Sequence, residues 1–346
     1  MNENALRPVY SGPPHLVILG AGASIASSLK NPEPNGKKLP SMLDFIEVIG
    51  LGDIVQTLPY DFDSENFEEV YSKLCEIDPE SDNIKEIERR VSEYFTSMTL
   101  PPEPTLYDYL VMSLRPKDVI ATFNWDPFLY DACRRNHTKT RLPRVVYLHG
   151  NVRIGHCMRD RRIGLIGTRC SKCRILVTLS KLLFPFTQKN YSNDPYVKFE
   201  WVAIGDALKH AQLVTVFGYS IPRTDVEAIR LMSEAWGTPG DRNLEQFEII
   251  DIQTEDVVRN RWAKFIHSHH YDYATDYFES RLGSFPRRTA EVYRHKIHPS
   301  TEEEALRNEL NLVPRDFSTL EEMWTWFDPL IEAENETSQS GDFDEY

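Results

Sequence analysis

The fold is decided by residues 15–24, HLVILGAGAS. The apolar first half of this stretch predicts a buried strand, and the two glycines that follow it predict a tight turn into a helix. Similar short apolar runs recur along the chain, at residues 119–122, 145–148, 213–217 and 247–250. Helical segments follow them, at residues 127–135, 198–210, 225–236 and 255–266. Strands that alternate with helices predict an α/β fold whose parallel sheet is covered on both faces.

Two segments interrupt this alternation. Residues 42–100 have the apolar spacing of helices, as in Phe67, Val70, Tyr71 and Leu74. We therefore predict a helical insertion there. Residues 151–190 hold three cysteines, and we predict a small cysteine-bearing module. Together these features predict a doubly wound, Rossmann-like sheet with two additions.

The ends of the chain differ from this central part. We assign residues 1–275 to one domain that includes both additions, and residues 276–331 to a C-terminal helical extension. Trp324, Trp326 and Phe327 lie in the extension, and we expect them in a core or an interface. The last fifteen residues, 332–346, contain six acidic and no basic residues, so we predict a disordered acidic tail.

The composition excludes several classes of protein. Of the 346 residues, 41% are hydrophobic and 11% aromatic, which is typical of a folded chain. The net charge of −14 argues against a surface that coats nucleic acid. No apolar run reaches the roughly 20 residues of a membrane-spanning helix, and the polar start lacks a secretion signal. We therefore expect a cytoplasmic protein with no membrane partner, in which five cysteines do not form a disulfide framework.

The turn after the first strand has the composition of a phosphate-binding loop. Gly20, Ala21, Gly22, Ala23 and Ser24 lie beside a predicted helix N-terminus, where backbone amides and the helix dipole favour an anion. The third glycine of the usual dinucleotide motif is absent, because an isoleucine occupies its position. A plain tight turn is the alternative interpretation.

Polar groups also follow the second and third predicted strands. Thr122, Asn124 and Asp126 alternate, so an extended segment would point them to the same side. Asp126, which precedes a proline, also fits a helix cap. His149 lies between an apolar strand and a glycine, and imidazole is a suitable general base near neutral pH. A structural role is the alternative for this histidine.

A second glycine turn follows the strand at 213–217. It consists of Gly218, Tyr219 and Ser220, with Asp225 shortly behind. The Ser220 hydroxyl could donate to a phosphate, whereas capping of the next helix is the alternative. Ligands of open parallel sheets bind at the carboxyl ends of the strands. We therefore expect all these polar groups to converge on one crevice.

Taken together, the motifs resemble those of the sirtuin-like family, in particular its divergent bacterial branch linked to antiviral defence. Residues 20–24 resemble the family's phosphate loop, and Thr-Phe-Asn-Trp-Asp at 122–126 resembles its Thr-x-Asn-aromatic-Asp motif. Leu-His-Gly at 148–150 resembles the segment with the catalytic histidine. Residues 218–220, with Asp225 behind them, resemble the third nucleotide-binding loop.

The resemblance runs from about residue 15 to about residue 270 and implies that the domain binds NAD and is catalytic. It implies that His149 is a general base toward a ribose hydroxyl, that Asn124 positions the water or the ribose, and that Asp126 supports the nicotinamide pocket. Cleavage of the nicotinamide–ribose bond develops an oxocarbenium-like centre, which needs orientation and one base. The cofactor-binding residues that the resemblance implies are Gly20, Ala21, Gly22, Ala23, Ser24, Thr122, Gly218, Tyr219, Ser220, Asp225 and Asp251.

Two departures from the family favour hydrolysis of NAD over lysine deacylation. Deacylating members carry Asp-Phe-Arg after the phosphate loop, where this chain has ASSLK at residues 26–30. They carry Phe-Gly-Glu after the zinc module, where this chain has LLFPF at residues 182–186. We therefore expect an NAD glycohydrolase that yields nicotinamide and ADP-ribose as the effector of a bacterial anti-phage (abortive infection) system. An NAD-dependent protein deacylase or ADP-ribosyltransferase, and a non-catalytic NAD- or ADP-ribose-binding scaffold, are the alternatives.

The chain contains no recognisable sensor segment of its own. We therefore expect that a homo-oligomer, or a separate sensor or ATPase partner, switches the enzyme on.

The cysteine module has half of a zinc signature. Cys170 and Cys173 have the Cys-x2-Cys spacing, and Cys157 lies upstream, so a fourth ligand is missing from the second pair. We expect a structural zinc with His156 as the fourth ligand, and histidines in residues 267–270 are further candidates. A metal-free remnant is the alternative.

The same module is locally basic. Between residues 153 and 174, Asp160 is the single acidic residue. The basic residues there are Arg153, Arg159, Arg161, Arg162, Arg169, Lys172 and Arg174. In an acidic chain this contrast indicates a docking surface for an acidic partner or nucleic acid, although direct nucleic-acid binding is not our expectation. A solvated loop is the alternative.

Overall fold

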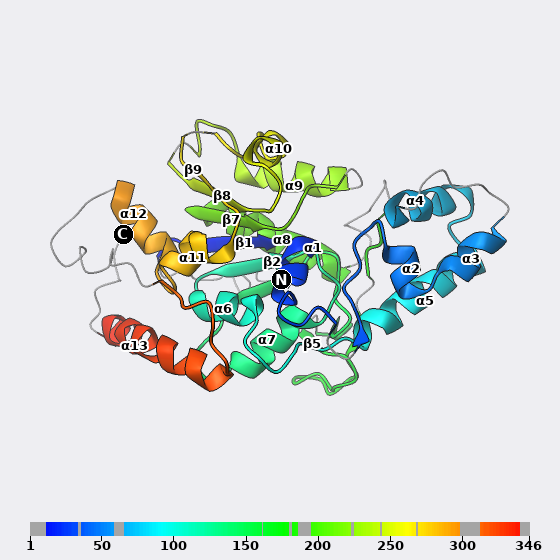
Figure 1. Ribbon diagram of the computed structural model, residues 1–346, viewed down its shortest axis with the longest axis horizontal. Helices are drawn as coiled ribbons and strands as arrows, with labels where there is room; N and C mark the ends of the chain where they lie inside the picture. Colours follow the sequence, from blue (N-terminus) through cyan, green and yellow to red (C-terminus); the bar gives the residue numbers. More distant parts are fainter. Residues whose placement is uncertain are drawn as a thin grey trace.

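A six-stranded, fully parallel sheet forms the centre of the protein, which we describe from a computed structural model (Figure 1). The structure describes residues 12–33, 36–58, 66–160, 162–179, 182–185, 195–222, 225–242, 244–267, 269–297 and 312–339. The strand order is β3-β2-β1-β7-β8-β9. The strands are β1 (His15–Leu19), β2 (Val119–Thr122), β3 (Arg144–Tyr147), β7 (Leu213–Phe217), β8 (Gln246–Ile250) and β9 (Tyr271–Ala274).

Helices cover both faces of this sheet, as the sequence predicts. Every residue of β1 is buried, and alternate residues belong to different cores. Leu16 and Ile18 pack in one core with α8 (Pro195–His210), α9 (Val226–Trp236) and α10 (Glu255–Arg261). Val17 and Leu19 pack in the other core with α6 (Leu106–Ser113) and α7 (Phe128–Asn136). The central strand therefore shows a continuous apolar run rather than an alternating pattern.

The register aligns the carboxyl ends of the strands. Leu19 pairs with Thr122 on one side and with Phe217 on the other. The turn after β1 leads into α1 (Ala21–Ser27), which lies beside the turns that follow β2 and β7. The polar residues of the three turns are consequently brought to one edge of the sheet.

The predicted helical insertion is present. It consists of α2 (Phe45–Ile49), α3 (Gly52–Thr57), α4 (Phe67–Ile77) and α5 (Asp82–Thr96). Asn66 and Ser81 start α4 and α5 by accepting hydrogen bonds from the backbone of Glu68 (2.9 Å) and Ile84 (3.3 Å). The insertion projects from the sheet at one end of the molecule, opposite the C-terminal helices (Figure 1).

The cysteine module has its own small sheet. Its strands are β4 (Ile154–His156), β5 (Ile163–Leu165) and β6 (Thr178–Leu179), in the antiparallel order β5-β4-β6. Gly155 has no space for a side chain, because a Cβ there would lie 1.9 Å from the Thr178 carbonyl oxygen. Arg161, which belongs to the predicted basic segment, lies outside the described residues.

The C-terminal extension is longer than predicted. It contains a 3-10 turn (Tyr277–Glu279), α11 (Arg281–Ser284), α12 (Thr289–Ile297) and α13 (Leu320–Gln339). The prediction of a disordered tail from residue 332 is wrong for residues 332–339, which are the end of α13. The remaining residues of that tail, 340–346, lie outside the described part.

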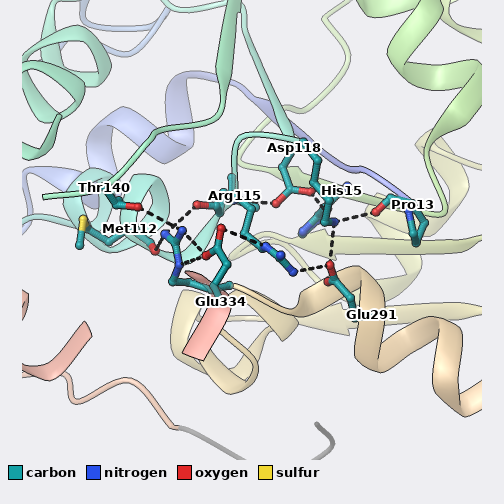
Figure 2. Close-up of polar contacts among 11 residues, drawn as sticks. Pro13, His15, Met112, Arg115, Asp118, Thr140, Glu291 and Glu334 are labelled. Carbon is teal, nitrogen blue, oxygen red and sulfur yellow. Dashed lines mark hydrogen bonds and ion pairs between the residues drawn. The ribbon is translucent and has the colours of Figure 1, made fainter. Parts of the chain in front are cut away.

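Charge pairing explains why this acidic segment is ordered (Figure 2). Glu334 pairs with the buried guanidinium of Arg287 and lies 3.3 Å from Arg115 Nε. The same helix buries Met323, Phe327 and Ile331 in the core that contains Val17 and Leu19. Composition alone could not show these partners, because they come from distant parts of the chain.

Two elements had no clear signal in the sequence. β9 is an edge strand with the half-buried sequence YDYA, so it lacks an apolar run. α6 is buried on all sides from Tyr107 to Ser113, and therefore has no polar face. Among the described residues, no helix combines the length and apolar character needed to cross a membrane.

Candidate active site

Two glycine turns contact each other at the carboxyl edge of the sheet. The Gly20 amide donates to the Phe217 carbonyl, and the Gly22 amide donates to the Gly218 carbonyl, both at 3.0 Å. A Cβ on Gly20 would lie 2.5 Å from the Gly218 carbonyl oxygen, and one on Gly218, where φ is +62°, would lie 2.4 Å from the Ala23 nitrogen. These contacts explain the glycines structurally, since any side chain would force the turns apart.

A hydrogen-bonded cluster lies behind the first turn. Asn124 Nδ2 donates to the Gly20 carbonyl (2.8 Å), to Ser24 Oγ (2.9 Å) and to the Tyr107 hydroxyl (3.1 Å). Ser24 Oγ also lies 2.6 Å from the Tyr107 hydroxyl and donates to Asp126 Oδ2 at 2.7 Å. Two segments that are distant from Asn124 in the sequence therefore fix its side chain in one orientation.

Asp126 is the buried end of this cluster. Its side chain accepts hydrogen bonds from Ser24 and from the Phe128 amide (3.1 Å), so it also supports the start of α7. Burial raises the pKa of Asp126 to about 6, and the hydrogen bond from Ser24 opposes that rise. Asp126 therefore supports the start of α7 and also belongs to the candidate site.

His149 lies in a second, mostly aromatic group. Its ring makes an edge contact with Phe123 at a centroid distance of 4.8 Å, and Phe123 stacks on Tyr219 at 4.1 Å. His149 Nε2 lies 3.8 Å from Asp225 Oδ1, and the Tyr219 hydroxyl donates to Asp225 Oδ2 at 2.6 Å. Phe123, His149 and Tyr219 come from the turns after β2, β3 and β7, and Asp225 directly precedes α9.

The two groups are adjacent, because Phe123 and Asn124 are neighbours in the chain. The structure therefore brings His149, Asn124 and Asp126 to the same edge of the sheet. A carboxylate beside the imidazole can orient the ring and stabilise its protonated form. This arrangement can hold a water or a hydroxyl group and accept a proton from it.

The remaining predicted binding residues lie around these groups. Thr122 is buried, and its Oγ1 accepts the Asn124 amide (3.0 Å), so it shapes the turn. Ser220 and Ala21 are exposed at the two turns, where Ala23 is buried. Asp251 follows β8 and accepts a hydrogen bond from the Gln253 amide at 2.8 Å. Asp225 precedes α9 but makes no side-chain cap there, because its carboxylate faces Tyr219.

The cysteine cluster has a different fourth member from the one we predicted. Ligand atoms of Cys157, Asp160, Cys170 and Cys173 all lie within 4.8 Å of one another. Cys157 Sγ is 3.3 Å from Cys173 Sγ, and Cys170 Sγ is 3.6 Å from Asp160 Oδ2. His156 instead stacks on the Tyr196 ring, because neighbouring residues at a strand end point to opposite faces.

This donor set fits zinc. A tetrahedral ion with Zn–S bonds of about 2.3 Å and Zn–O bonds of about 2.0 Å needs sulfur atoms roughly 3.8 Å apart and sulfur and oxygen roughly 3.5 Å apart. The sulfur–oxygen distance of 3.6 Å matches this geometry, and the two sulfur atoms at 3.3 Å need to separate by about half an ångström. Thiolates with one carboxylate suit zinc, and the basic residues of the module offset their negative charge. In this arrangement the ion would tie the hairpin at residues 169–176 to the loop after β4, which is a structural role.

Sequence reasoning missed two residues, Tyr107 and Asp160. Asp160 follows Cys157 with the same two-residue spacing that separates Cys170 and Cys173, so a pattern that accepts aspartate could have found it. Tyr107 lies on α6, whose start has a capping box formed by Thr105 and Asp108. That signal predicts the helix but not the contact of Tyr107 with Ser24.

The solved structures to which this chain is similar include several Sir2 proteins. No family model matches the sequence, and no curated protein matches it significantly. Among solved structures, a mutant Sir2 homologue with ADP-ribose is 14% identical, with a TM-score of 0.41 over 87% of this chain and 100% of that one.

Two further Sir2 structures are similar. A Sir2 homologue with NAD is 13% identical, with a TM-score of 0.39 over 86% of this chain and 96% of that one. A Sir2 with an inhibitor, 2′-O-acetyl-ADP-ribose and a deacetylated peptide is 16% identical, with a TM-score of 0.36 over 82% and 92%. At such identities we base the function on the site residues and not on these similarities.

Proposed function

We propose that this protein is an NAD glycohydrolase, which cleaves NAD to nicotinamide and ADP-ribose. The observation that carries the proposal is the placement of Asn124 and His149 at one edge of the sheet, each held by its own set of partners. The resemblance of the surrounding motifs to those of NAD-using sirtuin-like proteins names the substrate. The glycine turns and Asp251 are the proposed contacts for the diphosphate and the adenosine ribose.

The proposed step is a displacement at the ribose carbon C1′. The bond from C1′ to the nicotinamide nitrogen breaks, and its electron pair neutralises the pyridinium, so that nicotinamide leaves as a neutral molecule. The oxygen of a water forms the new bond to C1′, and the water loses one proton. NAD and water thereby give ADP-ribose, nicotinamide and a proton.

The two site residues have separate tasks in this step. Asn124 Nδ2 is held inward by three acceptors, so Oδ1 is the atom that would orient the water or a ribose hydroxyl. His149 would accept the proton, with the Asp225 carboxylate 3.8 Å away to stabilise the imidazolium. Asp126 acts through Ser24 and is a positioning residue.

One structural feature favours hydrolysis over deacylation. Phe184 is buried against Tyr71 and Trp125, with ring centroids 5.0 and 4.8 Å apart. This segment stands where deacylating sirtuins carry the Phe-Gly-Glu that borders the acyl-lysine groove. In this chain Phe184 instead packs between Tyr71 of the helical insertion and Trp125, which follows β2.

We also propose a biological setting from the same resemblance. The enzyme would be the effector of an anti-phage system, silent until infection and switched by self-assembly or by a sensor or ATPase partner. Depletion of NAD would then stop the growth of the infected cell. A purified chain that hydrolyses NAD at full rate by itself would count against this regulation.

Product analysis tests the chemistry. Purified protein is incubated with NAD and an extract of phage-infected cells, which supplies the proposed switch, with and without an acetyl-lysine peptide, and the products are separated by liquid chromatography. We expect nicotinamide and ADP-ribose in equal amounts, independent of peptide, and loss of both with Asn124→Ala or His149→Ala. O-acetyl-ADP-ribose formed only with peptide would establish a deacylase. NAD that binds but is not cleaved, in extracts of resting and of infected cells, would favour a scaffold.

A further inference from the structure

The surface of the cysteine module is both apolar and basic. Residues 153–179 are 27 of the 346 residues, yet they hold six of the sixteen exposed large apolar side chains in the part of the chain that the structure describes. These six are Met158, Ile163, Leu165, Ile175, Leu176 and Leu179. In the small sheet Ile163 and Leu165 point to one face and Leu179 points to the other, whereas Met158, Ile175 and Leu176 flank the cysteine cluster. We call these last three, with the exposed Arg159, Arg162, Arg169, Lys172 and Arg174, the module surface. Apolar groups gathered in this way are typical of an interaction site.

Charge makes the module surface distinct from the rest of the protein. Residues 153–179 contain seven basic residues and one acidic residue, a net charge of +6. Because the whole chain carries −14, the remainder carries −20. Arg162 and Arg169 are exposed and donate to the Ser171 hydroxyl and the Arg174 carbonyl, so neither hydrogen bond neutralises their charge.

The chemistry of the module surface suits a protein better than a nucleic acid. Binding of single strands depends on aromatic side chains that stack with bases. Residues 153–179 contain no Phe, Tyr or Trp, and their exposed apolar groups are aliphatic side chains and one methionine. A partner with an apolar centre and acidic surroundings is therefore the better fit.

The chain itself carries a surface of this kind. The last residue of α4, Ile77, is exposed and 43% accessible. The exposed carboxylates around it are Glu76, Asp78, Glu80 and Asp82, with no basic residue from 76 to 82. We call this segment the acidic tip; it belongs to the insertion that projects from the sheet (Figure 1).

We propose that the module surface of one copy binds the acidic tip of a second copy. Two module surfaces would repel each other, because both are basic, so each module surface meets an acidic tip; a reciprocal dimer, in which both contacts form at once, is the smallest closed assembly. Each copy then has one module surface and one acidic tip with which it can bind its neighbours. Such a contact builds a ring if the rotation closes and a filament if it does not. This assembly does not depend on the proposed enzymatic activity.

Two variants test the two halves of the contact. Ile175→Ser combined with Leu176→Ser weakens the module surface, and Glu76→Lys combined with Asp78→Lys reverses the acidic tip. Val202→Ser is the matched control, since Val202 is 63% exposed on α8 and outside both surfaces. Each variant is first checked for an unchanged melting temperature. If the double serine variant melts early, Arg162→Glu tests the same surface.

Sedimentation velocity of the full chain at about 50 µM gives the result. We expect the wild type and Val202→Ser to assemble at 50 mM salt and to dissociate toward monomer at 500 mM, because the contact is electrostatic. Each double variant alone should be monomeric. An equimolar mixture of the two should form dimers, because the intact tip of one variant can bind the intact module of the other.

Three results would overturn the proposal. The first is a monomeric wild type at low salt, and the second is assembly that neither double variant changes. The third is a mixture of the variants that stays monomeric although the wild type assembles. Binding of a duplex DNA probe by the module, lost in Arg162→Glu, would assign the surface to nucleic acid instead.

Discussion

Removal of one charge at the C-terminal helix should destabilise the whole protein. Arg287 has a side chain that is 3% exposed, and its guanidinium donates to Glu334 on α13, to the carbonyls of Met112 and Leu114, and to Thr140 (Figure 2). Glu334 supplies the negative charge in direct contact with this guanidinium. Glu334→Gln keeps the shape of the side chain and deletes that charge.

The size of the effect follows from burial. Loss of one partner of a buried ion pair costs about 3–5 kcal/mol, since the other charge stays buried and unpaired. Glu334 is 15% exposed, and Arg287 keeps its three other acceptors, so the cost should be at the lower end of this range. We expect a loss of about 3 kcal/mol in the free energy of unfolding, or roughly 5 °C in Tm for a chain of this size.

Urea denaturation followed by circular dichroism measures this loss. Glu332→Gln is the control, because Glu332 is exposed on the same helix, and it should change stability by less than about 0.5 kcal/mol. The deficit of Glu334→Gln should persist in 0.5 M salt, since a buried pair is poorly screened. Equal stability of the two variants would refute the idea that α13 is held by this charge.

Three further predictions concern pH, backbone packing and metal. Burial raises the pKa of Glu200 to about 7, so the folded state holds that proton more tightly than the unfolded chain, and the free energy of unfolding falls as pH rises from about 4.5 to 7. Urea titrations should show that Glu200→Gln is as stable as the wild type at pH 4.5 and about 3 kcal/mol more stable at pH 8. Gly218→Ala should lower Tm strongly, because its Cβ would lie 2.4 Å from the Ala23 nitrogen at a φ of +62°. Gly240→Ala is the control and should not lower Tm, because its Cβ would meet Thr238 Oγ1 at an ordinary contact distance of 3.7 Å. Mass spectrometry should find about one zinc per chain in the purified protein; Cys173→Ser should lose this zinc, and His156→Ala should keep it. Zinc retained by Cys173→Ser and lost by His156→Ala would contradict the cluster with Asp160.

The sequence was sufficient to predict the sheet where its strands are buried on both faces. β1, β2, β7 and β8 all appear as short apolar runs, since neighbouring helices cover them on each side. β9 was missed because an edge strand with the sequence YDYA has no such run. Local patterns therefore predict the elements in the middle of the sheet better than those at its edge.

The candidate site could be predicted only in part, for a similar reason. Asn124 and His149 follow buried strands, so their place at the carboxyl edge follows from topology alone. Tyr107 and its contact with Ser24 depend on how α6 packs against α1, which no local pattern encodes. The order of α13 likewise depends on Arg287, 47 residues away from Glu334.

The NAD content of living cells tests the central claim most directly. Bacteria that produce the wild type, Asn124→Ala or His149→Ala, together with the genes that neighbour the wild-type gene, are compared before and after phage infection. We predict that NAD falls and nicotinamide and ADP-ribose rise only in infected cells with the wild type. Unchanged NAD in all cultures, although the folded protein binds NAD, would contradict the account, and equal NAD loss in all three would place the chemistry elsewhere.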